Sequence, residues 1–303
     1  MSPMGHQALL DRSAFVSIEG CQLDLSELWN WRDFDQKRRR AIYQSFASAA
    51  PFPHLVVDGL FSDELLSLIV GEFDQLTAAD WRHARCENES THRSPFGLKL
   101  GPAAELYFSK IYSKDFIRFL SDVTGIETLI PDADLIGGGL HESHNGDWFN
   151  VHVDFAKHPR TLLDNELVIL TYLNKDWPEE YGGSLELWDA NTGECVKTIV
   201  PVFGRTVILK HGKTSLHGHT KPICAPDGRV RRSLAAYYYG HHDAPAVIDE
   251  EELTSAFFRP RRSTVTKIKE VVRMASPPVF VTMAKSVRRK LAGSTDWTSV
   301  RPR

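Results

Sequence analysis

The chain has 303 residues, 42% of them hydrophobic and 25% charged, and a formal net charge of -3. This composition is typical of a folded globular protein with one large domain or one domain with appendages, and it excludes disordered and fibrous classes. No apolar run reaches the roughly 18 residues of a membrane-spanning helix, and the N-terminus lacks the apolar stretch of a secretory signal. The four cysteines form no CxxC pair, so we expect a cytoplasmic protein without a disulfide framework.

The net charge hides an asymmetry between the body of the chain and its last segment. Residues 259–303 hold twelve Lys or Arg and two acidic residues, a net charge of +10, which leaves -13 on the rest. We interpret this segment as a solvated, partly helical extension, although basic tails are also typical of chains that contact nucleic acid or lipid headgroups. The partner we expect is a small-molecule or peptide substrate, with neither membrane nor nucleic acid involved, and the sequence indicates no oligomeric state.

Residues 1–130 have the pattern of a mainly helical support region. A basic cluster at 37–40 leads into a predicted helix that runs through Ala50, and Ser62 is a predicted helix start before an apolar helical face. Residues 80–101 are polar and predict an irregular segment. The remaining predicted elements are a short strand at 55–57 and a helix at 103–123.

Between residues 131 and 245 short β-like runs alternate with turns, which favours a sandwich or barrel over a parallel α/β sheet. Asn191-Thr192-Gly193 predicts a hairpin turn. Residues 246–303 then form the basic C-terminal extension, with helix candidates at 267–274 and 280–291 separated by two prolines. The strand candidates are 135–141, 147–155, 166–174, 182–189, 195–202, 205–211 and 233–240.

Three dispersed residues suggest a metal centre. His152 and Asp154 lie two apart on a predicted strand, so both side chains point to the same face. His217 follows 63 residues later, and a folded sheet must bring it near. Two imidazoles and one carboxylate are the ligand set of a non-haem Fe(II) oxygenase with open metal positions. An HxD pair alone is weak evidence, but an HxD pair followed by a sheet, a histidine and an arginine-led strand is much more specific.

Arg232 opens the aromatic strand candidate fifteen residues beyond His217. A guanidinium matches a carboxylate with two hydrogen bonds and stays charged, so Arg232 is expected to hold the carboxylate of 2-oxoglutarate. Arg231 competes for this role, but the spacing to Tyr238 favours Arg232, and Arg231 should point to the opposite face. His219 competes with His217 as a ligand, and we favour His217, which leaves His219 a role beside the metal or the substrate.

Residues 135–240 resemble the catalytic domain of the prolyl-4-hydroxylase-like 2-oxoglutarate/Fe(II)-dependent dioxygenase superfamily. The run TYLNKDW at 171–177 is similar to the corresponding stretch of animal oxygen-sensing prolyl hydroxylases, whereas residues 215–239 look more like bacterial members. The resemblance implies a mainly β protein with α-helices, in which a double-stranded β-helix (jelly-roll) core of eight strands has supporting N-terminal helices and a C-terminal helical extension.

The same resemblance implies the roles of the site residues. His152, Asp154 and His217 would be the iron ligands, Arg232 would bind the distal carboxylate of 2-oxoglutarate, and Tyr172 would hydrogen-bond to that carboxylate. The implied reaction consumes O2, releases succinate and CO2, and hydroxylates an aliphatic C–H bond, with ascorbate as a reductant of the iron. Related halogenases have a small residue in place of the carboxylate ligand, so the presence of Asp154 favours hydroxylation.

The sequence leaves the substrate and some of the pocket open. We favour a small biosynthetic molecule or amino acid, with protein prolyl hydroxylation as the alternative, and desaturation, epimerisation and ring closure stay possible outcomes. A non-catalytic jelly-roll binding module and a Zn or Mn enzyme of cupin type are the competing classes. The pocket candidates are Trp148 and Asn150, which alternation places on the face of His152, together with His219. His141, His144 and His158 are expected to be solvated loop histidines.

Overall fold

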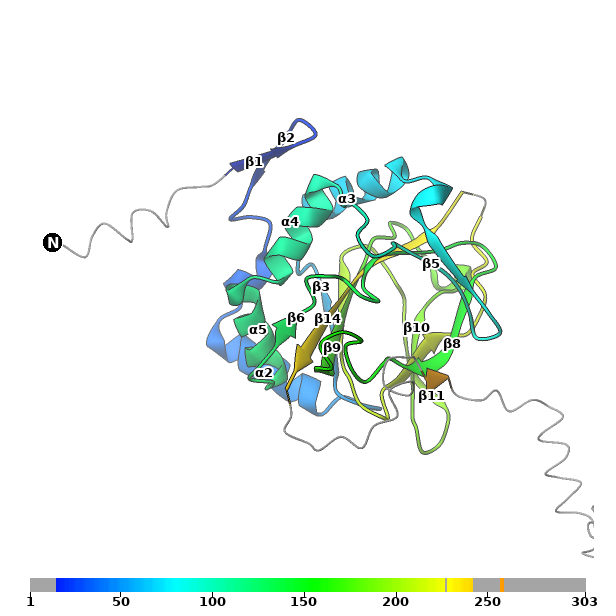
Figure 1. Ribbon diagram of the computed structural model, residues 1–303. Coiled ribbons are helices and arrows are strands. Elements are labelled where there is room, and N and C mark those ends of the chain that lie inside the picture. Colours follow the sequence, from blue (N-terminus) through cyan, green and yellow to red (C-terminus); the bar gives the residue numbers. More distant parts are fainter. Residues whose placement is uncertain (1–14, 227, 242–256, 259–303) are drawn as a thin grey trace, which may run out of the picture. The chain divides into compact units, whose positions relative to one another are not determined.

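The computed structural model describes residues 15–226, 228–241 and 257–258 (Figure 1). The chain divides into two units, 1–258 and 259–303, and all described residues belong to the first. The predicted helices of the basic extension therefore lie outside the described residues, and the domain boundaries at 130 and 245 remain predictions. Among the described residues, no helix has both the length and the apolar character needed to cross a membrane.

Among the described residues, thirteen strands form one continuous sheet, whose core divides into two antiparallel groups of four strands, here called the two sheets. As the chain proceeds it passes repeatedly from one sheet to the other, which is the topology of a jelly-roll, and the predicted fold is confirmed. One sheet has the strand order β7 (Gly139–Ser143), β14 (Arg231–Gly240), β9 (Asp164–Tyr172) and β12 (Arg205–Lys210). The other has the order β11 (Cys195–Ile199), β10 (Leu185–Trp188), β13 (Leu216–His219) and β8 (Trp148–Val153).

A polar hairpin from the N-terminal region joins the two sheets. Its second strand, β5 (Glu89–Arg93), pairs with both β7 and β8, and its first strand, β4 (Arg82–Arg85), pairs with β5 (Figure 1). The predicted irregular segment at 80–101 is therefore wrong. Neither strand alternates apolar and polar residues, so the usual sequence signal of a strand is missing. Strand β4 is also largely exposed on both faces.

Further short strands extend this core. The predicted strand at 55–57 is confirmed as part of β3, which pairs with β12 at the end of the first sheet. Asn191-Thr192-Gly193 forms the predicted turn between β10 and β11, where the Asp189 carboxylate accepts the backbone N–H groups of Asn191 and Thr192. The outlying strands are β1 (Phe15–Ile18), β2 (Cys21–Asp24), β3 (His54–Asp58), β6 (Ile130–Pro131) and β15 (Phe257–Phe258).

Four α-helices lie on the outer side of the sheet that contains β14 and β9 (Figure 1). The Ser62 side chain accepts the backbone N–H of Leu65, so the predicted helix start is confirmed. One helix was expected at 103–123, but Ser113 caps a second helix there and splits it in two. The helices are α2 (Gln36–Ala47), α3 (Asp63–Gln75), α4 (Pro102–Ile111) and α5 (Lys114–Thr124), with short 3-10 turns at Asn30–Asp33, Ala78–Asp80 and Glu179–Tyr181.

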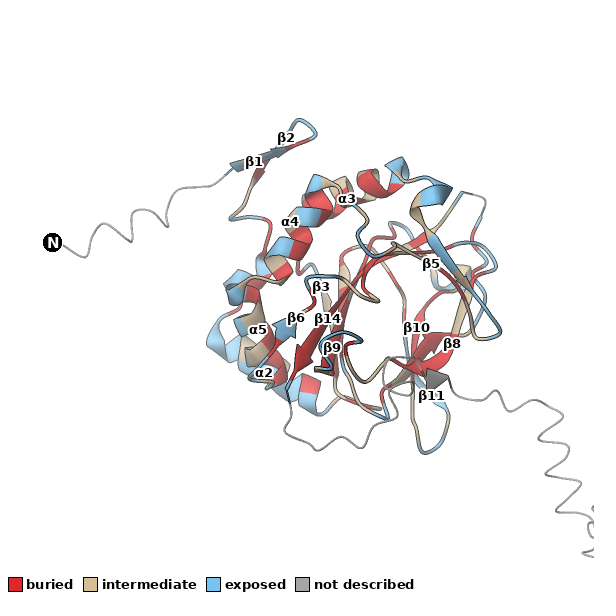
Figure 2. Cartoon of the chain, in the orientation of Figure 1, coloured by how far each residue is buried: buried red, intermediate tan, exposed pale blue. Residues whose placement is uncertain are grey.

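Alternation along β14 separates two hydrophobic cores. Leu234 and Tyr238 pack against the helices, whereas Tyr237 and Tyr239 face the space between the sheets. Both faces of this strand are buried except at Arg232, and Figure 2 shows most of β14 in red. Even-numbered residues of β14 therefore point to the helices and odd-numbered residues point to the interior, and this rule decides the position of its two arginines.

Candidate functional site

The three predicted metal ligands converge between the two sheets. One ligand atom from each of His152, Asp154 and His217 lies within 4.8 Å of the others, and all three residues are buried. The Nε2 atoms of His152 and His217 lie 3.4 Å and 3.6 Å from the Asp154 carboxylate oxygens. Adjacent strands bring them together, because β13 pairs with β8 and sets His217 opposite His152. The sheet therefore folds so that His217 lies near His152, as the sequence predicted.

Backbone carbonyls orient both imidazoles. His152 Nδ1 lies 2.8 Å from the Asn150 carbonyl oxygen, and His217 Nδ1 lies 2.9 Å from that of Ser215. A proton on each Nδ1 satisfies these carbonyls and leaves the Nε2 lone pair directed at Asp154, which is the tautomer that binds a metal.

The protonation states in this cluster also suit a metal ion. Burial lowers the pKa of His217 to about 4, although the Asp154 charge opposes the shift, so this imidazole is neutral at neutral pH. Burial acts to raise the pKa of Asp154, but the adjacent His217 and His152 outweigh it and hold the pKa below its ordinary value. A neutral imidazole at His217 and an ionised carboxylate at Asp154 are the ligand forms that bind a divalent ion.

Arg231 is the arginine that faces this cluster. It is 7% exposed and lines the same pocket as the three candidate ligands. Its Nε donates to the Gly183 carbonyl oxygen at 2.7 Å, and its guanidinium lies 5.0 Å from the centre of the Tyr172 ring and 3.5 Å from the Tyr172 hydroxyl. None of the described carboxylates pairs with Arg231. It is a buried cation with neutral neighbours.

Arg232 lies on the opposite face of β14, so the expectation that it faces the metal ligands is wrong. Its Nε donates to Glu142 Oε1 at 2.8 Å, and its terminal nitrogen lies 2.6 Å from Asp74 Oδ1 on α3. The physical reason is strand register: Ser233 pairs with Tyr172, and opposed residues share a face, so Arg231, two residues away, also shares it. Arg232 instead fastens α3 to the sheet.

Both pocket candidates from β8, Trp148 and Asn150, are wrong because the strand contains a bulge. His217 pairs with His152 but His219 pairs with Phe149, so three steps along β8 match two along β13. Phe149 and His219 consequently line the pocket, whereas Trp148 and Asn150 do not. Gly218 permits this close approach, since a Cβ atom there would lie 2.8 Å from the carbonyl oxygens of both Phe149 and Asn150.

Three further pocket residues were missed as site residues. Thr91 and Arg93 come from the hairpin strand β5, and His141 comes from β7 rather than from a solvated loop. Burial lowers the pKa of His141 to about 3, and its buried Nε2 has no hydrogen-bond partner among the described residues. His158 is also buried, 3.5 Å from Asp132, whereas the side chain of His144 is half exposed as expected.

The fold and this site define the class of protein. A jelly-roll that presents two histidines and one aspartate between its sheets, with a buried cation beside them, matches a non-haem iron oxygenase that takes an anionic cosubstrate. Residues 138–239 match the family model of the 2OG-Fe(II) oxygenase superfamily. This part of the chain therefore has the pattern of a 2OG-Fe(II) oxygenase domain, and the group that the model describes is one of oxidoreductases that use Fe(II) and 2-oxoglutarate.

Comparison with solved structures gives similar chains. A Pseudomonas putida prolyl-4-hydroxylase has a TM-score of 0.49 at 16% identity, covering 67% of this chain and 100% of that chain. A Trichoplax adhaerens prolyl hydroxylase, solved with a hypoxia inducible factor peptide, has 0.48 at 13%, covering 67% and 90%. HygX from Streptomyces hygroscopicus, solved with nickel, 2-oxoglutarate and hygromycin B, has 0.45 at 14%, covering 73% and 95%. No curated protein matches the sequence.

Proposed function

We propose that the chain is a hydroxylase in which His152, Asp154 and His217 hold Fe(II), and Arg231 with Tyr172 holds the distal carboxylate of 2-oxoglutarate. Arg231 thus takes the role expected of Arg232. The observation that carries the proposal is a buried guanidinium beside the candidate ligands that has no carboxylate partner among the described residues.

The energetics of this arginine favour an anionic ligand. Burying an ion costs several kcal/mol unless an opposite charge compensates it. Burial lowers the pKa of Arg231, while Tyr172 opposes the shift. Burial also raises the pKa of Tyr172, so its hydroxyl keeps its proton at neutral pH and can donate to a carboxylate. A dicarboxylate with one end at Arg231 supplies the missing charge.

The other residues prepare the site for oxidation chemistry. The iron held by these residues would supply the activation of O2, which would oxidise 2-oxoglutarate to succinate and CO2. Three protein ligands leave the remaining metal positions open for the keto acid and O2. Val168, Leu170 and Leu185 form an apolar part of the pocket wall, which limits the entry of water. The Asn150 and Ser215 carbonyls keep the two imidazoles in the orientation that binds the metal.

For the substrate we propose a small polar molecule, such as an amino acid, that is hydroxylated at an aliphatic carbon. Arg93 lies on the pocket wall, where its guanidinium pairs with Glu89 and lies 5.2 Å from the centre of the Phe149 ring. The buried Nε2 of His141 offers a hydrogen-bond position on the same wall. A polar substrate with an amine or hydroxyl group would give His141 a partner, and a carboxylate on the same molecule would bind beside Arg93, whose remaining guanidinium N–H groups can donate to it.

The reaction class is tested by succinate formation from 2-oxoglutarate, with Fe(II) and ascorbate, in the wild type and in Asp154→Ala. We expect slow substrate-independent turnover in the wild type and none in the variant. Equal rates, or no turnover together with no binding of 2-oxoglutarate, would reject the oxygenase assignment in favour of a non-catalytic module.

The substrate class is tested by a screen for a mass increase of one oxygen atom coupled to succinate release. Its arms are free amino acids, small hydroxylated metabolites and proline-containing peptides. Coupling confined to the peptides would replace our proposed substrate with a protein prolyl residue.

A further inference from the structure

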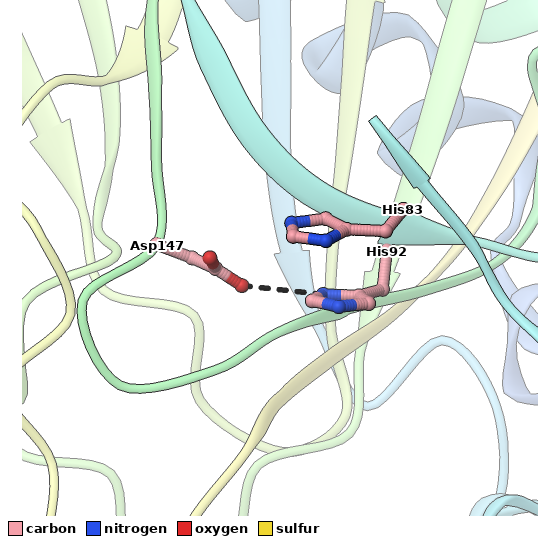
Figure 3. A group of neighbouring side chains, drawn as sticks. All are labelled: His83, His92 and Asp147. Carbon is pink, nitrogen blue, oxygen red and sulfur yellow. Dashed lines mark ion pairs between the residues drawn. The ribbon is translucent and has the colours of Figure 1, made fainter. Parts of the chain in front are cut away.

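A second group of histidines lies outside the site described above. His83 on β4, His92 on β5 and Asp147 in the turn before β8 each offer a ligand atom within 4.8 Å of the others (Figure 3). His92 Nδ1 lies 3.3 Å from Asp147 Oδ2, the ion pair dashed in Figure 3. The rings of His83 and His92 stack, with centroids 4.1 Å apart and planes 11° from parallel.

Ser90 links the group into one network. Its hydroxyl donates to Asp147 Oδ1 at 2.5 Å and lies 3.1 Å from His83 Nε2. The second carboxylate oxygen of Asp147 accepts the backbone N–H of His144 at 2.7 Å. These contacts hold the buried carboxylate of Asp147 in place, with His92 beside it and His83 linked to it through the Ser90 hydroxyl.

We propose that His83, His92 and Asp147 form a second metal site, which binds a divalent ion such as Zn²⁺ separately from His152, Asp154 and His217. Imidazole nitrogen and carboxylate oxygen are ligands that Zn²⁺ binds at about 2.0–2.2 Å, usually four in number, so one position is left for water. The two stacked rings cannot share one ion until one of them turns. His83 can turn because it is exposed on the outer strand of the hairpin, and β5 is the strand with which β4 pairs.

The ion would fasten the hairpin to the turn that leads into β8. Two of its ligands lie on β4 and β5, and the third lies in that turn, so one ion ties three chain segments together. The same β5 strand contributes Thr91 and Arg93 to the pocket wall. The site would therefore support the pocket without contacting the reacting atoms, and the inference does not depend on the proposed function.

The experiment counts Zn²⁺ ions per chain by native mass spectrometry after chelator stripping and reloading. The variants are the wild type, His83→Ala, His152→Ala as the matched control for the first site, and the double variant. We expect two bound Zn²⁺ ions in the wild type, one at each site. Each single variant should bind one ion, and the double variant should bind none. Melting of the metal-free proteins checks that the exposed His83 position does not affect folding, and His83→Gln, which keeps the side-chain size, replaces His83→Ala if it does.

Ser90→Ala adds a second readout. Loss of a residue that orients metal ligands weakens metal affinity by about 10–100-fold, so a titration with Co²⁺ should show that loss at this site and an unchanged affinity at the other. The proposal would be overturned if His83→Ala binds as many ions as the wild type. It would also be overturned if the wild type binds one ion and His152→Ala binds none. A wild type that holds a single ion, lost in His83→Ala and kept in His152→Ala, would reject the assigned iron ligands and leave this inference intact.

Discussion

Substituting Arg231 and Arg232 separately tests which arginine binds the cosubstrate. Arg231 is buried beside Tyr172 and the candidate metal ligands, whereas Arg232 pairs with Glu142 and Asp74 on the helix side of β14. Arg231→Gln should therefore weaken 2-oxoglutarate binding strongly, and Arg232→Gln should leave it nearly unchanged.

The magnitude follows from the burial of Arg231. Truncating one partner of a buried, hydrogen-bonded charge pair costs about 2–5 kcal/mol, which corresponds to a loss of affinity of roughly 30-fold to several thousand-fold. A ligand at 100 times its Kd stabilises a protein by about 2.7 kcal/mol, and each kcal/mol shifts Tm by about 2–4 °C for a domain of this size. The wild type should gain about 5–10 °C from 2-oxoglutarate with a redox-inert metal, and Arg231→Gln between about 0 and 3 °C at the same concentration.

The assay is thermal melting with and without 2-oxoglutarate, combined with the KM for 2-oxoglutarate in the succinate assay. Arg232→Gln provides the matched control: it should lower the Tm of the ligand-free protein, because buried Glu142 loses an ionic partner, yet keep the ligand-induced shift. A large shift retained in Arg231→Gln but lost in Arg232→Gln would refute the reasoning from strand register and restore Arg232 as the anchor.

Three further predictions concern structure and pH. Gly218→Ala should displace the strand that carries His217, because a Cβ would lie 2.8 Å from two carbonyl oxygens, and both Tm and metal affinity should fall; wild-type affinity would contradict this. Glu72→Ala removes the carboxylate that accepts the N–H groups of Ala103 and Ala104, so the free energy of unfolding should fall by about 1–3 kcal/mol in denaturant titration, and a smaller loss argues against that cap. Hydrogen bonds from Arg205 lower the pKa of Asp58, so this exposed pair stabilises the fold above the ordinary value of 3.8 and is lost as the pH falls through the lowered pKa. Asp58→Asn should cost under about 1 kcal/mol at pH 7, and a cost that stays constant down to the acid transition would count against the pair.

The jelly-roll and the convergence of the candidate ligands could be predicted because they depend on local alternation. His152 and Asp154 share a face through the two-residue period of a strand, and a third ligand after a later strand requires the sheet to fold over. The choice between Arg231 and Arg232 depended instead on the register of β14 against β9, which neither strand determines alone. Ser233 was the available signal, since it is a polar residue on a buried strand and shares the face of Arg231.

The remaining differences also come from non-local geometry. The bulge in β8 places Phe149 on the pocket wall in place of Trp148 and Asn150. It could not be predicted from β8 alone, because it depends on how β13 pairs with β8. The hairpin that contains Thr91 and Arg93 has no alternation of apolar and polar residues. It lies beside the pocket and buries little apolar surface of its own. Its polarity therefore predicts a loop, although the main chain forms a regular ladder.

The strand β5 has a consequence for how such an enzyme can acquire new substrates. It pairs with both sheets yet stands outside the eight core strands, and it contributes pocket residues without contributing any of the three candidate iron ligands. On the proposed function, the part of the pocket wall that β5 supplies is thus encoded apart from the iron ligands, although Phe149 and His219 on the same wall share their strands with those ligands. A graft that replaces residues 82–93 would alter selectivity while the oxidation machinery is inherited unchanged.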